Sequence, residues 1–194
     1  MLTLEITSDI SQELIEKIVL MDHDAYPPDD QMTWDRAYMI YGHIKDSLIL
    51  LKEDGRLIGF VSIYGVRPEL VPLAVNRQRP IFAVEEKAHL LPVITQPCDG
   101  YLHNIILCPE YRGRGYRRFL YLGLKCWLDR HERLNRIWAD AVSENGRRAL
   151  EALGLVPCPE LKGLWGGEMQ NVYLAIEKQL AGIRFDPNTI QEAR

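Results

Sequence analysis

The stretch Tyr101-Leu-His-Asn-Ile-Ile-Leu-Cys-Pro-Glu-Tyr-Arg-Gly-Arg-Gly-Tyr-Arg-Arg-Phe-Leu120 joins a strand, a glycine-rich turn and the start of a helix. Its apolar run over residues 101–107 is typical of a strand, and Pro109 ends the run because proline cannot donate to a sheet ladder. Unpaired N–H groups and the dipole at a helix start favour an anion, and glycines let it come close. The stretch therefore predicts a phosphate site.

The turn Arg112-Gly113-Arg114-Gly115-Tyr116-Arg117 lacks the Gly-Lys-Ser/Thr of a P-loop and the third glycine of the dinucleotide fingerprint. Together with the strand and Pro109-Glu-Tyr before it, the turn resembles the acyl-CoA-binding motif of the GNAT superfamily of N-acetyltransferases, Arg/Gln-x-x-Gly-x-Gly/Ala. Arg117 departs from this motif, which has glycine or alanine at that position. Its guanidinium either crowds the pyrophosphate or binds it. A solvated turn rich in arginine and glycine is the alternative interpretation.

The resemblance implies an α/β (α+β) fold with a central mixed, mostly antiparallel sheet of about six or seven strands flanked by helices. We expect one domain over residues 1–180 and a polar, frayed tail over residues 181–194. An insert over residues 65–99 separates the third and fourth strands. Its runs at 80–84 and 90–94 suggest an added ribbon. The insert forms either a wall of the acceptor pocket or a segment that binds a partner or covers a sheet edge.

Apolar periodicity and turn residues predict the remaining elements. Helices are expected to begin near Ser11, after Thr33 or Asp35, at Arg114 or Gly115, and after Ser143, with Gly154 past the end of the last one. Strands are expected at 2–6, at 47–51 and 57–63 joined through Asp54-Gly55, at 136–142, and finally at 171–178 after a glycine-rich loop around Trp165.

The composition narrows the class of protein. The chain has 194 residues, 47% of them hydrophobic, and its net charge of −4 argues against general nucleic-acid binding. The four cysteines form no Cys-x-x-Cys pair, so we expect neither a metal site nor a disulfide framework. The sequence shows no signal-peptide pattern and no apolar run long enough to span a membrane. We expect a cytoplasmic protein without nucleic-acid or membrane partners, and a homodimer is one option.

The resemblance also implies a reaction, the transfer of an acetyl group from acetyl-CoA to an amine of a small molecule, peptide or protein. The donor must be held near the amine, its carbonyl polarised, and a proton removed from the nucleophile. Backbone of the strand end is expected to hold the pantetheine arm at Ile105, Ile106 and Leu107. The phosphates are expected at Arg112, Gly113, Arg114, Gly115, Tyr116 and Arg117.

The candidate catalytic residues are His103, Asn104 and Tyr173. Family members often carry an acidic residue where His103 stands, and histidine titrates near neutral pH. A hydrogen-bonded structural histidine is the alternative. Strand alternation places Tyr101 and His103 on one face of the sheet and Asn104 on the other. The family's usual general acid, a tyrosine, is replaced by Leu150, which leaves Tyr116, Tyr121 or Tyr173 as substitutes.

Two questions stay open from the residues alone. The loop from Asp22 to Asp30 holds four aspartates, which either attract a cationic amine or form a solvated acidic loop. The leading hypothesis for function is an N-acyltransferase. The alternative is a non-catalytic acyl-CoA sensor or interaction module on the same fold, which Arg117 and Leu150 favour. An α/β phosphate-binding protein outside the family is a third possibility.

Overall fold

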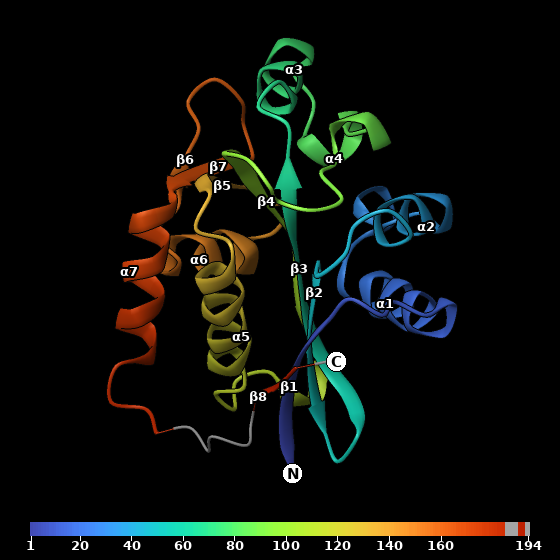
Figure 1. Ribbon diagram of the computed structural model, residues 1–194, viewed down its shortest axis with the longest axis vertical. Helices are drawn as coiled ribbons and strands as arrows, with labels where there is room; N and C mark the ends of the chain where they lie inside the picture. Colours follow the sequence, from blue (N-terminus) through green and yellow to red (C-terminus); the bar gives the residue numbers. More distant parts are fainter. Residues whose placement is uncertain (185–189, 193–194) are drawn as a thin grey trace.

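The computed structural model describes residues 1–184 and 190–192, and these residues form one eight-stranded mixed sheet with helices on both faces (Figure 1). The strand order is β6-β7-β5-β4-β3-β2-β1-β8, with parallel pairing in β4–β5 and β1–β8 and antiparallel pairing elsewhere. The strands are β1 Leu2–Thr7, β2 Leu48–Glu53, β3 Arg56–Val66, β4 Cys98–Leu107, β5 Leu134–Asp140, β6 Val156–Pro157, β7 Leu164–Glu168 and β8 Ile190–Glu192. The predicted mixed, mostly antiparallel sheet is confirmed.

Helices α5, α6 and α7 cover one face of the sheet, α1 and α2 cover the other, and α3 and α4 lie at one end (Figure 1). Short 3-10 turns lie at Pro28–Asp30, Lys87–His89 and Pro109–Tyr111. The α-helices are α1 Gln12–Ala25, α2 Trp34–Tyr41, α3 Leu70–Arg77, α4 Ile81–Val84, α5 Arg117–Arg130, α6 Glu144–Ala152 and α7 Met169–Leu180.

Local sequence signals set the N-terminal half as predicted. The side chain of Ser11 caps α1 by accepting a hydrogen bond from Leu14 N. The side chain of Thr33 caps α2 by accepting one from Arg36 N. Asp54 and Gly55 join β2 to β3 with φ of 48° and 81°. Positive φ at both central residues is the requirement of a type I′ hairpin turn, which explains the Asp-Gly pair.

The C-terminal prediction was wrong in its order of elements. Residues 171–178 form part of helix α7, in which Val172 and Ile176, four residues apart, are buried against the sheet. The last long strand is β7, where a glycine-rich loop had been expected. A Cβ at Gly166 would lie 2.4 Å from the Trp138 ring, so the glycine lets β7 lie beneath that indole. The run at 171–178 fits a strand and a helix equally well, and burial decides between them.

The insert and the tail also differ from expectation. The predicted ribbon at 80–84 and 90–94 is absent from the described chain; that part of the insert instead carries α4 and a single bridge between Val66 and Leu90. Ile81, Val84 and Leu90 are buried in the core that α1 and α2 share with the sheet. Within the expected frayed tail, β8 pairs in parallel with β1, while residues 185–189 and 193–194 lie outside the described part.

Helix α5 lies close against the sheet at Gly123. An added Cβ there would lie 2.4 Å from Cγ2 of Ile49 on β2, which is closer than a real contact permits. Leu120, Leu124 and Trp127, on the same helix, are buried in the core on this face of the sheet. Close packing at this glycine sets how near the N-terminal end of α5 lies to the sheet.

We expect Gly123→Ala to lower the free energy of unfolding by about 1–3 kcal/mol, because overpacking outweighs the roughly 1 kcal/mol gain in helix propensity. Urea denaturation measures the change. Gly146→Ala in α6 is the control, since its Cβ would meet, among the described residues, just Ser143 Oγ at 3.2 Å. A Gly123 variant as stable as the wild type would contradict this close approach.

Candidate functional site

The two central parallel strands separate beside the predicted cofactor stretch. Strand β5 pairs with β4 at Cys98, Gly100 and Tyr101, and in the described chain no strand continues this pairing along residues 102–107. The free edge of β4 opens a groove of about 730 Å³ that Ile105, Ile106 and Leu107 line. Backbone groups at an unpaired edge are available to a ligand. The groove lies where the resemblance places the pantetheine arm.

A bulge in β4 changes which side chains face α1. Ser62 of β3 pairs with Asn104 and Ile63 pairs with Leu102, so His103 is the extra residue. His103 packs against Tyr64 and Tyr101, with ring centroids 5.9 and 5.6 Å away. Asn104 Nδ2 donates to Asp22 Oδ1 of α1 at 3.2 Å. The expectation that Asn104 faces away from His103 was therefore wrong, because the bulge interrupts the alternation.

The glycine-rich turn forms one end of the groove. Gly113 and Gly115 adopt φ of 73° and 83°, a left-handed conformation that glycine reaches without strain. Arg112 Nε donates to Leu107 O at 2.9 Å and ties the turn to the end of β4. The predicted phosphate-side residues that line the groove are Arg112, Gly113, Gly115, Tyr116 and Arg117, whereas Arg114 does not line it.

Arg117 stands at the first position of α5, where the family motif has a small residue. Its guanidinium lies 5.7 Å from the centre of the Tyr121 ring, a cation–π contact within its own helix. The groove keeps its volume of about 730 Å³ with this side chain in place. Arg117 thus adds a positive charge at the helix N-terminus without filling the groove.

The opposite wall of the groove comes from α6. Ser143 caps this helix by accepting a hydrogen bond from Gly146 N at 3.0 Å, as its sequence predicts. Arg148 and Leu150 line the groove from the same helix, and the arginine is a cation that sequence reasoning missed. Leu150 occupies the position where the family has its tyrosine.

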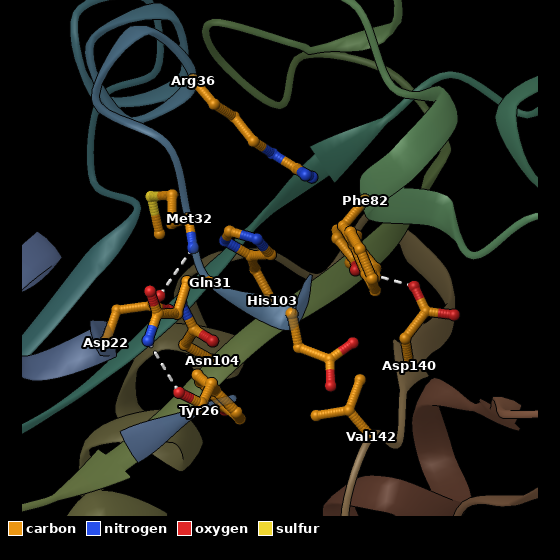
Figure 2. A pocket seen from close by; sticks show the side chains of 12 residues that line it. Asp22, Tyr26, Gln31, Met32, Arg36, Phe82, His103, Asn104, Asp140 and Val142 are labelled. Carbon is orange, nitrogen blue, oxygen red and sulfur yellow. Dashed lines mark hydrogen bonds between the residues drawn. The ribbon is translucent and has the colours of Figure 1, made fainter. Parts of the chain in front are cut away.

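A second, smaller cavity of about 30 Å³ adjoins the groove on the side of α1 and α2. Figure 2 shows Asp22 and Asp140 on either side of His103, with Phe82 of the insert and Arg36 of α2 nearby. The residues that line both the cavity and the groove are Tyr26, His103, Asn104, Asp140 and Val142. These shared residues mark the junction of the two spaces.

Asp140 is the functional candidate that sequence reasoning missed. It ends β5, and its Oδ2 accepts hydrogen bonds from Tyr101 Oη at 2.9 Å and from Ile81 N at 2.9 Å. Burial raises the pKa of Asp140 to about 6, against the partly opposing effect of these hydrogen bonds. The signal in the sequence was an acidic residue at the C-terminal end of a strand next to the cofactor strand.

His103 lies at the junction as a neutral imidazole. Burial lowers its pKa well below the usual value, and the nearby Arg36 charge lowers it further. Its Nδ1 is buried and has no hydrogen-bond partner among the described residues.

The insert forms part of the cavity wall. Phe82 lines the cavity, and Ile81 N holds Asp140. Glu85, whose side chain is fully buried, forms an ion pair with Arg36 and accepts a hydrogen bond from Tyr64 Oη at 2.9 Å. These contacts make the insert part of the wall of this cavity.

Tyr173 lies away from both spaces. Its hydroxyl donates to Asp129 Oδ1 at 2.7 Å and accepts from Lys125 Nζ at 2.5 Å, which ties α7 to α5. Tyr116 lines the groove, but its hydroxyl donates to Glu53 at 2.7 Å. Tyr26 is therefore the tyrosine that reaches the junction.

The described residues contain neither a metal-binding cluster nor a membrane-spanning helix. In residues 1–184 and 190–192, no three or more His, Cys, Asp or Glu side chains lie close enough together to hold a metal ion. No helix in that part of the chain has the length and apolar character needed to cross a membrane.

The buried ion pair beside the cavity generates a stability prediction. We expect Arg36→Leu to lower the free energy of unfolding by about 3–5 kcal/mol, because it leaves the Glu85 carboxylate buried without its cation. Urea denaturation measures the loss. The matched control is Arg56→Leu, whose partner Glu110 is 48% exposed, and there we expect a change of at most about 1 kcal/mol. Equal losses in the two variants would contradict a structural role for the buried pair.

Comparisons with known proteins agree on the fold. The Drosophila melanogaster polyamine N-acetyltransferase, which catalyses the formation of N-acetylagmatine, is 12% identical over 87% of this chain and 100% of that one, with a TM-score of 0.55. The loading GNATL domain of CurA from Lyngbya majuscula is 13% identical over 96% and 86%, also with a TM-score of 0.55. A mosquito arylalkylamine N-acetyltransferase like 5b is 12% identical over 87% and 100%, with a TM-score of 0.53.

No curated protein sequence matches the chain. At these identities the similarity to the solved structures supports the fold alone. The model of the acetyltransferase (GNAT) family matches residues 15–154, more than half of the chain, and this range contains the groove, the glycine-rich turn and the junction with the cavity. The protein belongs to the GNAT acetyltransferase family.

Proposed function

We propose that the protein transfers an acetyl group from acetyl-CoA to a primary amine. The observation that carries the proposal is the junction, where a groove suited to the donor meets a cavity that holds the buried carboxylate of Asp140. A donor in the groove and an amine in the cavity would meet at this point. Holding the two reactants together there supplies much of the rate enhancement.

The chain's own residues fit acetyl-CoA in the groove. Arg112 and Arg117 offer positive charge, and the two left-handed glycines bring backbone close to the pyrophosphate. The free edge of β4 offers backbone groups to the pantetheine arm and to the thioester carbonyl, where negative charge develops. In the reaction the amine nitrogen bonds to the carbonyl carbon, the carbon–sulfur bond breaks, and CoA leaves as a thiolate.

Asp140 is the stronger candidate for the base that takes the proton from the amine. With its pKa near 6, its carboxylate is ionised at neutral pH and a better base than an ordinary aspartate. The neutral imidazole of His103 could also take a proton, but burial lowers its pKa and therefore makes it a weaker base. Asn104 donates to Asp22, so we assign it a positioning role. Tyr26, at the junction, replaces Tyr173 as the candidate that returns a proton to the thiolate.

A non-catalytic acyl-CoA-binding module remains the second candidate. Leu150 favours it, because this residue lines the groove where family members carry the acidic hydroxyl. The two functions differ in one measurement, the appearance of acetylated product with a panel of amines. Cytoplasmic localisation and a homodimer remain predictions from the sequence.

We expect acetyl-CoA at about a hundred times its dissociation constant to raise the melting temperature by roughly 5–10 °C, from about 2.7 kcal/mol of binding free energy, while ATP has no effect. Gly115→Glu should abolish this rise, because it places a Cβ and a negative charge beside the phosphates. The control is Gly182→Glu, which has a similar φ of 76° but lies outside the groove. A rise retained in the Gly115 variant would remove the turn from the donor site.

We expect Asp140→Asn to lower kcat by about a hundredfold or more while CoA still binds. The wild-type rate should rise with pH through about 6, and the variant should lack this limb. Because burial raises the pKa of Asp140 from 3.8 to about 6, the stability that its protonated form contributes is lost as the pH rises from about 4 through about 6. We therefore expect the melting temperature of Asp140→Asn minus that of the wild type to be larger at pH 8 than at pH 5.

Asp129→Asn is the matched control for Asp140→Asn, since its carboxylate contacts Tyr173 and Lys125 outside the groove, and its kcat should equal that of the wild type. The assignment of Asp140 would be wrong if its variant kept the wild-type rate and the same acidic limb.

A further inference from the structure

The carboxyl groups of the acceptor cavity are not equivalent in position. Asp140 lines both the cavity and the donor groove, so it stands at the junction. Asp22 and Asp30 line the cavity but not the groove, so they lie on the side away from the donor. An acceptor that reaches from the junction into the cavity therefore passes from one carboxylate toward two others.

Asp22 is fixed in place as part of the cavity wall. It is 2% exposed, its Oδ2 accepts a hydrogen bond from Met32 N at 2.7 Å, and its Oδ1 accepts one from Asn104. Asp30 is half-buried, and no described residue donates a hydrogen bond to its carboxylate. One of the two carboxylates is thus rigid, and the other has its full capacity to accept hydrogen bonds from a ligand.

Among the described residues that line the cavity, carboxylates outnumber cations. Arg36, the cation in its lining, is committed to the buried carboxylate of Glu85. His103 is neutral there, and its Nδ1 is buried in the lining without a partner among the described residues. A buried polar atom without a partner is costly unless a ligand or water satisfies it. The charge points to a cationic occupant. In the tautomer of His103 that carries its proton on Nε2, Nδ1 would accept a hydrogen bond from an N–H group of that occupant.

We propose that the amine acceptor carries a second cationic nitrogen, which the cavity binds between Asp22 and Asp30 while the reacting nitrogen lies beside Asp140. This inference rests on the proposed function and names the class of its substrate. The cavity is narrow, about 30 Å³, with Tyr26 and Phe82 among its lining residues. A slim, unbranched terminal diamine fits this description better than a branched or aromatic amine.

The reaction balances with one nitrogen at each end. The ammonium nitrogen beside Asp140 loses one proton to the carboxylate and attacks the thioester carbonyl carbon. The carbon–sulfur bond then breaks, the nitrogen loses a second proton to become the amide, and the thiolate takes up a proton and leaves as CoA. The far nitrogen stays protonated, so the product is a mono-acetylated amine with one positive charge. Acetylation removes the charge of the reacting end, which weakens its attraction to Asp140 and favours release.

Asp29 provides a control residue for Asp30 in the same 3-10 turn. Asp29 is exposed and lines neither space, although it is the sequence neighbour of Asp30. The sequence predicted a loop from Asp22 to Asp30, but Asp22 and Asp24 lie in the last turn of α1 and Asp29 and Asp30 in the 3-10 turn that follows. These four aspartates divide between the two interpretations that the sequence left open. Asp22 and Asp30 belong to the cavity, and Asp24 and Asp29 are solvated.

The test compares unbranched terminal diamines of three to six carbons with monoamines of the same lengths. Binding to the protein with CoA present is measured by titration calorimetry, and acetylation is measured with acetyl-CoA. We expect the best diamine to bind about tenfold or more tightly than its matched monoamine, the size of one charge-assisted hydrogen bond. Asp30→Asn should remove this advantage through KM with little change in kcat, and Asp29→Asn should retain it.

The outcomes separate this inference from the proposed function. Two results would overturn the second cationic subsite and leave the acetyltransferase proposal intact. The protein would acetylate monoamines and diamines with equal efficiency, or Asp30→Asn would lower the efficiency equally for both. Diamine-selective binding without acetylated product would support the subsite and count against catalysis. If none of these amines binds or reacts, the diamine inference is wrong.

Discussion

The site depends on one interruption in the backbone hydrogen bonding. Strands β4 and β5 pair as far as Tyr101 and then part, so the end of β4 keeps its backbone groups for a ligand. The same separation makes room for the groove and leaves Asp140 at the end of β5 facing the junction. A bulge at His103 strengthens the effect, because it turns two successive side chains toward the cavity. Binding and chemistry thus share one constraint on the sheet.

Sequence reasoning succeeded where the determinant is local. The strand, glycine turn and helix around Arg112 and Gly115 were predicted, because left-handed glycines and a helix start are determined within a few residues, and the turn lines the groove. That acetyl-CoA binds there stays a prediction. Helix caps at Ser11 and Ser143 and the Asp54-Gly55 turn were predicted for the same reason. The family match then extends this local signal over residues 15–154.

The failures concern residues whose role depends on distant partners. No local pattern shows that His103 is a bulge, since the extra residue is defined only by its pairing with β3. In the sequence Asp140 is simply the last residue of a strand. Its hydrogen bonds from Tyr101 and Ile81 N, and the burial that raises its pKa, depend on residues far away in the chain. The alternation at 171–178 fits either a helix or a strand, and contact with the sheet selects the helix.

Helix α4 joins the insert to Asp140, the carboxylate that we propose as the base, and this link has an evolutionary consequence. The backbone N–H of Ile81 donates to Asp140 and opposes the rise in its pKa that burial causes. Segments like this insert vary readily among related proteins, because surface connections tolerate changes in length. In this protein such a change would alter the acidity of the carboxylate along with the shape of the cavity. Substrate range and working pH would then evolve together rather than separately.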